Sequence, residues 1–235
     1  MDYEKVLIKV LKENNIIPTD EMLSQFERYY EMLIEYNSMF NLTSIIQKED
    51  VYLKHFADSL LGVKEYKFGA TLCDIGTGAG FPGIVIKIAR PDLCIVLVDS
   101  LNKRVNFLNN IINALNLDNI IALHFRAEDK EFKKKYLNTF DYVVARAVAN
   151  LNTLTEYCLP YVKVSGTFIA YKSDNITDEI DQALNCICVL GGNNLRSKYY
   201  DLTETIRRQL IFIDKVHNTD LKYPRDKNKP RTNPI

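Results

Sequence analysis

The spacing of apolar residues along the chain changes near Gly69. Before that position apolar side chains recur every three or four residues, which is the period of helices that bury one face. We therefore expect residues 1–68 to form a helical extension of three helices that packs on the rest of the chain. Pro18-Thr19 is a helix start signal. The clearest stripe after it consists of Leu23, Phe26, Tyr30, Leu33 and Ile34.

After Gly69, short apolar runs typical of strands alternate with helical patterns. This alternation predicts an α/β domain over residues 69–215, with a mostly parallel sheet and helices on both of its faces. Such sheets bind ligands at the carboxyl ends of their strands. One predicted helix places Val105, Leu108, Ile112 and Leu115 on one face. The predicted strands are 71–74, 94–99, 120–125, 141–145, 166–171, 196–201 and 207–215.

The link between the last two predicted strands is only Thr203-Glu204-Thr205. Parallel neighbours need a crossover of about a dozen residues, so we expect these two strands to form an antiparallel hairpin. The sequence thus predicts a sheet of seven strands that is mostly parallel and ends on an antiparallel strand.

Composition places few limits on the partners of this chain. Its 235 residues, 47% of them hydrophobic, suffice for one α/β core with a small appendage. The formal net charge is zero, so any contact with nucleic acid must be local.

The segment 216–235 is the basic part of the chain. It has five Lys or Arg against Asp220 and Asp226, which gives a local charge of +3, and it contains three prolines. We expect it to stay mobile until it meets a nucleic acid, with Lys222 and Arg225 as phosphate contacts. An inert, solvated tail is the alternative.

The sequence gives little support for a membrane segment or a metal-binding site. The N-terminal region has neither the apolar run of a signal peptide nor a stretch long enough to cross a bilayer. The five cysteines lack the paired spacing of a zinc site, and we interpret them as buried thiols of a cytoplasmic protein. We therefore expect no metal and no membrane partner.

The segment Asp74–Gly83 joins an acidic strand end to a glycine-dense turn that opens a helix. Glycine is required where the backbone takes positive φ or where a Cβ would hold a ligand away. The helix that follows offers N–H groups without partners in the helix. A nucleotide-like cofactor fits this arrangement, although a tight structural turn without a ligand is an alternative.

Two cofactors compete for this loop. Gly78, Gly80 and Gly83 satisfy the G-x-G-x-x-G pattern, and Asp99 lies at the spacing of a ribose-binding carboxylate, so an NAD(P)-dependent oxidoreductase is one hypothesis. Asp74 opposes it, because a carboxylate at the loop entrance repels a pyrophosphate. S-adenosylmethionine has no phosphate and carries a sulfonium and an ammonium that Asp74 would attract. The antiparallel end of the sheet also favours a methyltransferase.

Several short motifs occur together along nearly the whole chain. They are Asn41-Leu42-Thr43, His55-Phe56-Ala57-Asp58-Ser59, Asp74 through Gly83, Asp99 through Arg104, Arg126-Ala127-Glu128, Arg146-Ala147-Val148-Ala149 and Lys222-Tyr223-Pro224-Arg225. In this combination the chain resembles the glucose-inhibited division protein B family, which are bacterial small-subunit ribosomal RNA (guanine-N7) methyltransferases. The resemblance implies a Rossmann-like class I methyltransferase fold and S-adenosylmethionine as the cofactor. It also implies 16S ribosomal RNA or the small ribosomal subunit as the partner.

Each candidate cofactor-binding residue has its own basis. Asp74, Gly78 and Gly80 follow from the loop, and Asp99 would accept the ribose hydroxyls, with a role at the start of the next helix as its alternative. The resemblance adds five residues, two of which follow the third strand and are therefore expected beside the adenine. These positions are Gly76, Phe81, Ala127-Glu128 and Arg146.

Arg146 ends the fourth strand, where methyl transfer is expected. The Asn/Asp-Pro-Pro-aromatic motif of exocyclic-amine methyltransferases is missing there. A cationic donor instead suits the acceptor-rich O6 and N7 edge of guanine. N7 has no proton to lose, so catalysis reduces to positioning. A structural salt bridge of Arg146 to Glu128 or Asp99 is the alternative.

A second catalytic group is expected on the helix that contains Leu53 and Phe56. If these apolar residues face the core, Lys54, His55, Asp58 and Ser59 share the opposite face. A surface or capping histidine is the ordinary interpretation of His55. The resemblance makes His55, Asp58 and Ser59 candidates for shaping the guanine pocket.

Three further cations are expected at the carboxyl ends of the strands as phosphate contacts: Lys103, Arg104 and Lys172. Together with the family resemblance, these features predict a cytoplasmic, monomeric, S-adenosylmethionine-dependent enzyme that methylates guanine N7 of 16S ribosomal RNA. An NAD(P)-dependent oxidoreductase and a non-catalytic RNA-binding module are the alternatives.

Overall fold

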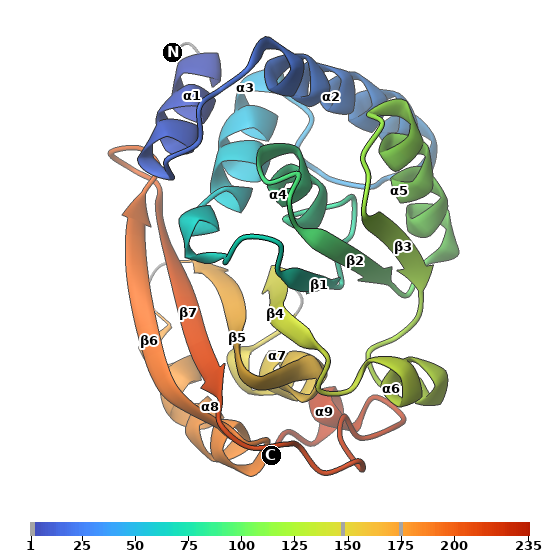
Figure 1. Ribbon diagram of the computed structural model, residues 1–235, viewed down its shortest axis with the longest axis vertical. Coiled ribbons are helices and arrows are strands. Elements are labelled where there is room, and N and C mark those ends of the chain that lie inside the picture. Colours follow the sequence, from blue (N-terminus) through green and yellow to red (C-terminus); the bar gives the residue numbers. More distant parts are fainter. Residues whose placement is uncertain (1–2, 147–148, 174–175) are drawn as a thin grey trace. The chain divides into compact units, whose positions relative to one another are not determined.

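A computed structural model describes residues 3–146, 149–173 and 176–235 of the chain (Figure 1). The chain divides into two compact units. The first unit contains Met1–Ala70 and Thr77–His124, and the second contains Thr71–Gly76 and Phe125–Ile235. The helical region before Gly69 thus forms one unit with residues 77–124, and the basic tail belongs to the other.

The first unit begins with the helices that the sequence predicts. Thr19 caps the second helix, because its side chain accepts a hydrogen bond from the amide of Met22. A π-helical turn, η1, continues the third helix, and a short 3-10 turn, η2, follows. The bounds are α1 Tyr3–Glu13, α2 Asp20–Phe40, α3 Lys48–Val51, η1 Tyr52–Ala57 and η2 Val63–Glu65.

The buried face of α2 differs from the predicted stripe by a small rotation. Leu23, Tyr30 and Ile34 are only half-buried. Hydrophobic spacing alone could not choose between neighbours at the edge of the stripe, because adjacent helical residues point only about 100° apart. The buried residues of α2 are Met22, Phe26, Tyr29, Met32 and Leu33.

The remainder of the first unit is a strand-and-helix segment. β2 and β3 pair in parallel, from Ile95 opposite Ile120 to Asp99 opposite His124. The face of α5 that the sequence predicts to be apolar is buried, including Leu108. The bounds are α4 Gly83–Ala89, β2 Cys94–Asp99, α5 Asn102–Ala114 and β3 Ile120–His124.

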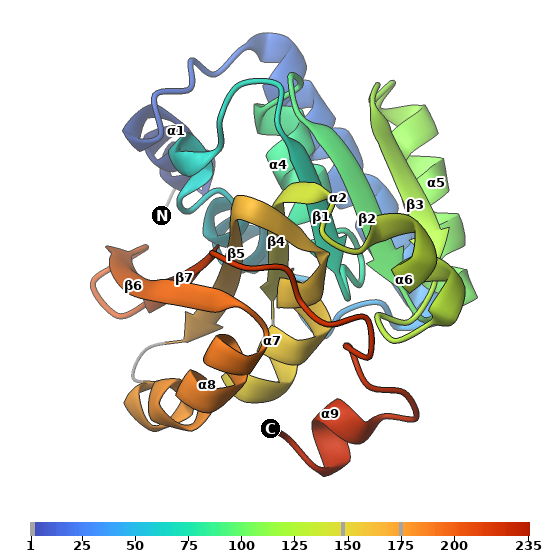
Figure 2. The ribbon, with the colours of Figure 1, turned by 60° about the horizontal axis from the view of Figure 1, so that its bottom comes forward.

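The second unit contains five strands in the order β1-β4-β5-β7-β6. β1, β4 and β5 run parallel, whereas β7 is antiparallel to β5 and to β6. Figure 2 shows α7 and α8 side by side beneath this part of the sheet. The strands are β1 Thr71–Ile75, β4 Phe140–Arg146, β5 Val162–Ser173, β6 Gly192–Asp201 and β7 Arg207–Lys215. The helices are α6 Lys130–Tyr136, α7 Leu151–Cys158, the 3-10 turn η3 Leu159–Tyr161, α8 Thr177–Val189 and α9 Lys229–Thr232.

The predicted fold class is confirmed. The described residues contain seven strands at the predicted places, mostly parallel, and the last two form the expected antiparallel hairpin. β2 and β7 have the predicted bounds, and β5 and β6 begin four residues earlier than predicted.

The cysteines are buried in part. Cys73, Cys158 and Cys186 are buried, but Cys94 and Cys188 are exposed, so the prediction of buried thiols is wrong for these two. Cys94 is the first residue of β2 and Cys188 lies on the open side of α8 near its end. An apolar run does not reveal which of its terminal positions a neighbour covers.

The tail is packed on the second unit, so its predicted mobility is wrong. The guanidinium of Arg225 donates to both carboxylate oxygens of Glu156 at 2.8 and 2.7 Å, and the Arg225 amide donates to the same carboxylate at 2.9 Å. Thr153 donates to the carbonyl of Pro230 at 2.9 Å. Glu156 and Thr153 both belong to α7, and a buried carboxylate requires such a partner.

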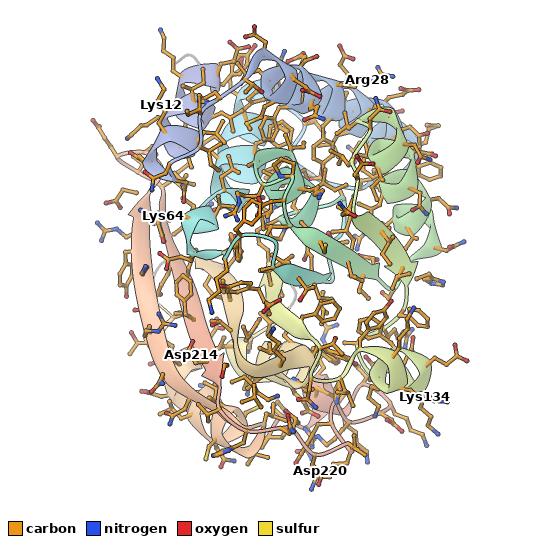
Figure 3. The ribbon with its side chains drawn as sticks, in the orientation of Figure 1. Lys12, Arg28, Lys64, Lys134, Asp214 and Asp220 are labelled. Carbon is orange, nitrogen blue, oxygen red and sulfur yellow. The ribbon has the colours of Figure 1, made fainter. Side chains whose placement is uncertain are left out.

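One lysine of α6 also holds the tail. Lys133 donates to the carbonyl of Pro224 at 3.0 Å and lies 3.4 Å from the carboxylate of Asp226. Lys134, in contrast, is exposed and points away from the protein (Figure 3). The basic run 133–135 is therefore only partly a solvated face.

Lys215, the last residue of β7, is 1% exposed. Its Nζ donates to the carbonyl of Leu159 at 2.8 Å and to the hydroxyl of Thr219, which in turn donates to the carbonyl of Leu190 at 2.6 Å. Burial disfavours the charged ammonium and lowers the pKa of Lys215 to about 7.

We expect Glu156→Ala to lower the free energy of unfolding by about 2–4 kcal/mol, because it leaves Arg225 partly buried without its carboxylate. Urea denaturation measures this change. Asp201→Ala is the matched control, since the pair of Asp201 with Arg207 is more than half exposed on both sides. It should cost less than about 0.5 kcal/mol. Equal effects of the two variants would contradict a structural role for the tail.

The titration of Lys215 predicts a pH dependence of stability. Between pH about 7 and the ordinary lysine value of 10.5, the unfolded chain holds a proton that the folded chain lacks. The free energy of unfolding contributed by this group therefore rises with pH in that window. Lys215→Met should flatten the rise in urea denaturation measured at several pH values. The exposed Lys12→Met is the control and should keep the wild-type slope; parallel curves for all three proteins would refute the assignment.

Candidate functional site

The glycine loop of the first unit is fixed on the carboxylate of Asp99. This residue ends β2, is 3% exposed, and accepts the Gly78 amide at 2.9 Å on Oδ2. The same oxygen lies 3.3 Å from the guanidinium of Arg104, and Oδ1 accepts the Leu101 amide at 2.9 Å. Asp99 therefore fixes the glycine loop and orders the start of α5, which is its alternative role, while ribose binding by this carboxylate stays a prediction.

Two glycines of the loop are required for different reasons. Gly78 has a φ of +63° with open space around its Cα, which is the feature of a loop that a ligand can approach closely. Gly80 has a φ of +103°, and a Cβ there would lie 2.6 Å from the hydroxyl of Tyr29 and 2.6 Å from Cγ1 of Ile84. Gly80 is thus needed for packing.

Phe81 follows the loop and contacts aromatic rings of the N-terminal helices. Its ring stacks on the imidazole of His55 with 4.3 Å between centroids and 16° between planes. It also stacks on the ring of Tyr29, at 5.5 Å and 26°. The sequence did not single out Tyr29, because helical spacing favoured Tyr30.

His55, Asp58 and Ser59 do not lie on an exposed face. They are 9%, 4% and 0% exposed, so their predicted orientation is wrong, and of the predicted polar face only Lys54 is partly open. The reason is the π-helical turn η1, in which the amide of Asp58 bonds to the carbonyl of Leu53 five residues earlier. This wider turn changes the direction of the residues that follow, and π turns are frequent at functional sites.

The imidazole of His55 has a defined polar partner. Its Nε2 lies 3.0 Å from the hydroxyl of Thr43, which also accepts the Ile45 amide at 3.1 Å. The amide of Thr43 donates to the side chain of Asn37 in α2 at 2.8 Å. The segment Asn41-Leu42-Thr43, to which sequence reasoning gave no role, therefore holds the His55 ring.

In the second unit, Asp74 lies fully buried in β1, opposite Val144 of β4. Gly76, just after β1, has a φ of +73°. Arg146 is the last residue of β4, half-buried and opposite Tyr171 of β5. Ala147 and Val148 of the same motif lie outside the described residues.

Ala127 and Glu128 lie in a closed turn between β3 and α6. The amide of Arg126 donates to the carboxylate of Asp129 at 2.7 Å, and the buried hydroxyl of Tyr161 donates to the carbonyl of Ala127. Ala127 is 8% exposed and Glu128 is half-buried. The backbone of Ala127 is thus fixed and the carboxylate of Glu128 is more accessible, while their contact with adenine stays a prediction.

Three of the predicted phosphate contacts have internal carboxylate partners, and the first of them is Arg104, which lies beside Asp99. Lys172 donates to the carboxylate of Glu179 at 2.5 Å and to the carbonyl of Ala149 at 2.9 Å, while that carboxylate accepts the Leu151 amide at 2.9 Å. Arg225 pairs with Glu156. Sequence reasoning missed Glu179 and Glu156, because carboxylates in helical patterns ordinarily face water.

The other predicted cations lie nearer the surface. Lys103, in the first turn of α5, donates to the carbonyl of Phe40 at 3.0 Å. The side chain of Lys222 is 63% exposed and lies 3.4 Å from the Asp220 carboxylate. RNA binding by these residues stays a prediction.

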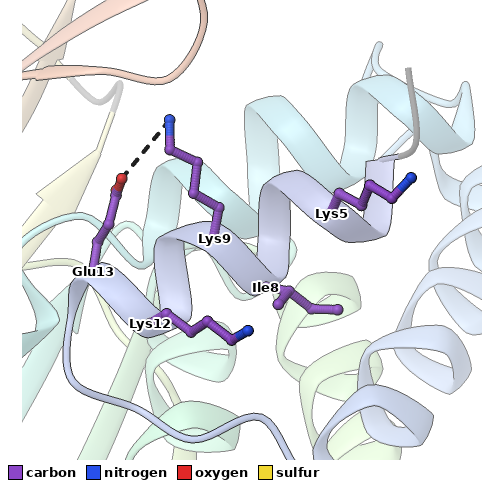
Figure 4. Close-up of a pocket in the computed structure, with 5 residues that line it drawn as sticks. All are labelled: Lys5, Ile8, Lys9, Lys12 and Glu13. Atoms are coloured by element: carbon purple, nitrogen blue, oxygen red, sulfur yellow. Dashed lines mark ion pairs between the residues drawn. The ribbon is translucent and has the colours of Figure 1, made fainter.

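A surface hollow on α1 is not part of the candidate site. Figure 4 shows its lining residues, among which Lys9 lies 3.7 Å from the Glu13 carboxylate. They are Lys5, Ile8, Lys9, Lys12 and Glu13. Since none is a predicted site residue, we assign this hollow no role in the reaction.

Two general properties of the described residues bear on the site. No helix among them has both the length and the apolar character that crossing a bilayer requires. In that part of the chain, no group of three or more His, Cys, Asp or Glu is arranged to hold a metal ion.

The fold is similar to that of solved methyltransferases. TYW2 from M. jannaschii in complex with AdoMet has a TM-score of 0.55 at 12% identity, over 74% of this chain and 80% of that one. A SAM-dependent methyltransferase from Aquifex aeolicus has a TM-score of 0.53 at 17% identity, over 74% and 96%. At these identities the likeness shows the fold.

Sequence similarity extends further. Residues 22–211 match the family described as GidB, rRNA small subunit methyltransferase G. A ribosomal RNA small subunit methyltransferase G from Lachnoclostridium phytofermentans is 51% identical over 91% of this chain and 89% of its own. A protein of the same name from Lactobacillus helveticus is 44% identical over 100% of both chains. The chain therefore belongs to the rRNA small subunit methyltransferase G family.

Proposed function

We propose that this protein transfers a methyl group from S-adenosylmethionine to N7 of a guanine in 16S ribosomal RNA. The observation that carries the proposal is a glycine loop fixed on the strand-end carboxylate of Asp99, in a chain that matches this family over residues 22–211. Family membership favours this reaction over the oxidoreductase alternative. We expect the enzyme to act as a monomer in the cytoplasm, where ribosomal subunits are found.

The residues of the first unit suit the adenosine ribose. A carboxylate has about four acceptor positions, and three N–H donors already occupy Asp99. The contact with Arg104, at 3.3 Å and with that side chain 32% exposed, is the weakest of the three. We propose that one ribose hydroxyl takes the fourth acceptor position of the Asp99 carboxylate and that the other takes the position now held by Arg104. The displaced guanidinium of Arg104 would then lie beside the cofactor.

The residues of the second unit suit the adenine and the charged end of the cofactor. We propose that the Ala127 amide donates to a ring nitrogen and that the carboxylate of Glu128 accepts the exocyclic amine. The buried carboxylate of Asp74 supplies negative charge, which attracts an ammonium or a sulfonium and repels a phosphate. Gly76 and Gly78 keep the backbone free of side chains at the loop.

When bound, S-adenosylmethionine supplies an electrophilic methyl group on a sulfonium. Guanine N7 has a lone pair and no proton, so no residue of this chain needs to act as a base. We propose that Arg146 donates to guanine O6 and thereby directs the N7 lone pair toward the methyl. This catalysis consists of positioning and of excluding water.

The remaining predicted residues are proposed to act on the RNA. His55 contacts Phe81, so it would shape the guanine pocket through that ring, together with the buried Asp58 and Ser59. Lys103 and Lys222 would contact phosphates, which supply affinity without selecting a sequence. Lys172 and Arg225 would have to leave their carboxylate partners to do the same.

We expect S-adenosylhomocysteine to bind and NAD not to bind in isothermal titration. Asp99→Ala should weaken the binding of S-adenosylhomocysteine by about 1–3 kcal/mol, because the ribose hydroxyls lose a charged acceptor. The exposed Asp118→Ala is the control and should leave affinity unchanged. A 2′-deoxy analogue of S-adenosylhomocysteine should bind wild type more weakly than the parent compound does. Asp99→Ala should bind the two compounds almost equally, because the carboxylate that accepts the hydroxyl is already gone. Tight NAD binding would overturn the cofactor assignment.

We expect methylated 16S ribosomal RNA to carry 7-methylguanine when the digested RNA is analysed by mass spectrometry. Arg146→Ala should lower kcat at saturating RNA at least about 100-fold, since the target base is no longer aligned. Its affinity for S-adenosylhomocysteine, measured separately, distinguishes a loss of cofactor from a loss of alignment. Methylation of an exocyclic amine would contradict the proposed chemistry. If no methylation occurs at all, the alternative of a non-catalytic RNA-binding module is favoured instead.

A further inference from the structure

The glycine loop is held from a second side by the helix α2. The hydroxyl of Tyr29, a residue with 0% exposure, donates to the carbonyl of Ala79 at 2.5 Å. Ala79 follows Gly78, whose amide is bonded to Asp99. Two successive residues of the loop are therefore fixed, one through its N–H by the end of β2 and the other through its C=O by α2.

The packing around this hydrogen bond leaves little freedom. The Tyr29 ring stacks on Phe81, immediately after the loop, and on Phe56 of η1 at 5.3 Å. Gly80 lies so close to the Tyr29 hydroxyl that a Cβ would come within 2.6 Å of it. The loop is thus shaped to fit the tyrosine, including its oxygen.

Apolar packing between α2 and η1 does not by itself require a hydroxyl, because a phenylalanine would fill the same space. A buried tyrosine hydroxyl needs a polar partner, and here the partner is a backbone carbonyl of the loop. The hydroxyl therefore serves the loop conformation.

We propose that Tyr29 is a positioning residue for the cofactor, which sets the loop in its binding conformation before the cofactor arrives. The inference rests on the proposed binding of S-adenosylmethionine at this loop. A glycine-rich loop has many accessible conformations, and a ligand that orders it loses affinity. By fixing Ala79, Tyr29 removes part of that cost, so the helical extension contributes to cofactor affinity without touching the cofactor.

The test compares Tyr29→Phe with Tyr30→Phe. Tyr30 is the neighbouring, half-buried tyrosine of α2, and its hydroxyl bonds at 3.5 Å to the carbonyl of Ile46, away from the loop. Both substitutions keep the ring, so the chain should fold. In isothermal titration, Tyr29→Phe should raise the Kd of S-adenosylhomocysteine about three- to tenfold, and Tyr30→Phe less than twofold.

A second pair of measurements separates positioning from a general loss of stability. Hydrogen exchange of residues 78–81 should be faster in Tyr29→Phe than in wild type without ligand, and the two should converge at saturating S-adenosylhomocysteine. In turnover, the KM for S-adenosylmethionine should rise while kcat stays within twofold. These outcomes support the proposal.

The opposite outcomes are distinguishable. If wild type fails to bind S-adenosylhomocysteine, the proposed function is wrong. If wild type binds and Tyr29→Phe binds equally tightly at a temperature where both are folded, Tyr29 has only a structural role and the inference is overturned. If Tyr29→Phe has a lower melting temperature but an unchanged Kd for S-adenosylhomocysteine, the inference is likewise overturned.

Discussion

The hydrogen bonds of the buried Asp99 carboxylate are the interaction on which the geometry of the first unit depends. A charge with 3% exposure is tolerated only where donors surround it, and here they come from the loop, from the start of α5 and from Arg104. This one group therefore fixes the end of β2, the direction of the glycine loop and the beginning of the next helix. Tyr29 supports the same loop from the helical extension.

Buried and half-buried ion pairs organise the second unit in a similar way. Glu156 holds the tail through Arg225, and Glu179 holds Lys172 together with the amide of Leu151. Once such pairs form, removing either partner is costly, because the other charge stays behind in a poorly solvated place. Residues that look like a solvated surface in the sequence thereby become structural supports.

This use of charge bears on how the protein would meet RNA. Its net charge is zero, and three of the predicted phosphate-binding cations, Arg104, Lys172 and Arg225, pair with carboxylates that are buried or half-buried. Electrostatic attraction without sequence preference would then come from a few exposed lysines such as Lys222. Selection of the target would depend on the shape and hydrogen bonding of the base pocket.

The sequence by itself determined those features that depend on neighbours along the chain. Helix and strand periods placed all seven strands found among the described residues, Thr19 marked a helix start, and a short link specified the final hairpin. The glycine pattern followed by Asp99 located the loop, since the turn and its carboxylate acceptor lie on consecutive elements. These features follow from local geometry, which a period or a short motif records.

Only the tertiary structure decided which residues support the site. Tyr29 and Ala79 are 50 residues apart, and Arg225 and Glu156 are 69 apart, so no local pattern could pair them. The choice of Tyr29 over Tyr30, and the burial of His55 by a π-helical turn, depend on what packs against each helix. Hydrophobic spacing records that a residue is apolar or polar; the partner that satisfies a buried hydroxyl, imidazole or charge is determined by the folded chain.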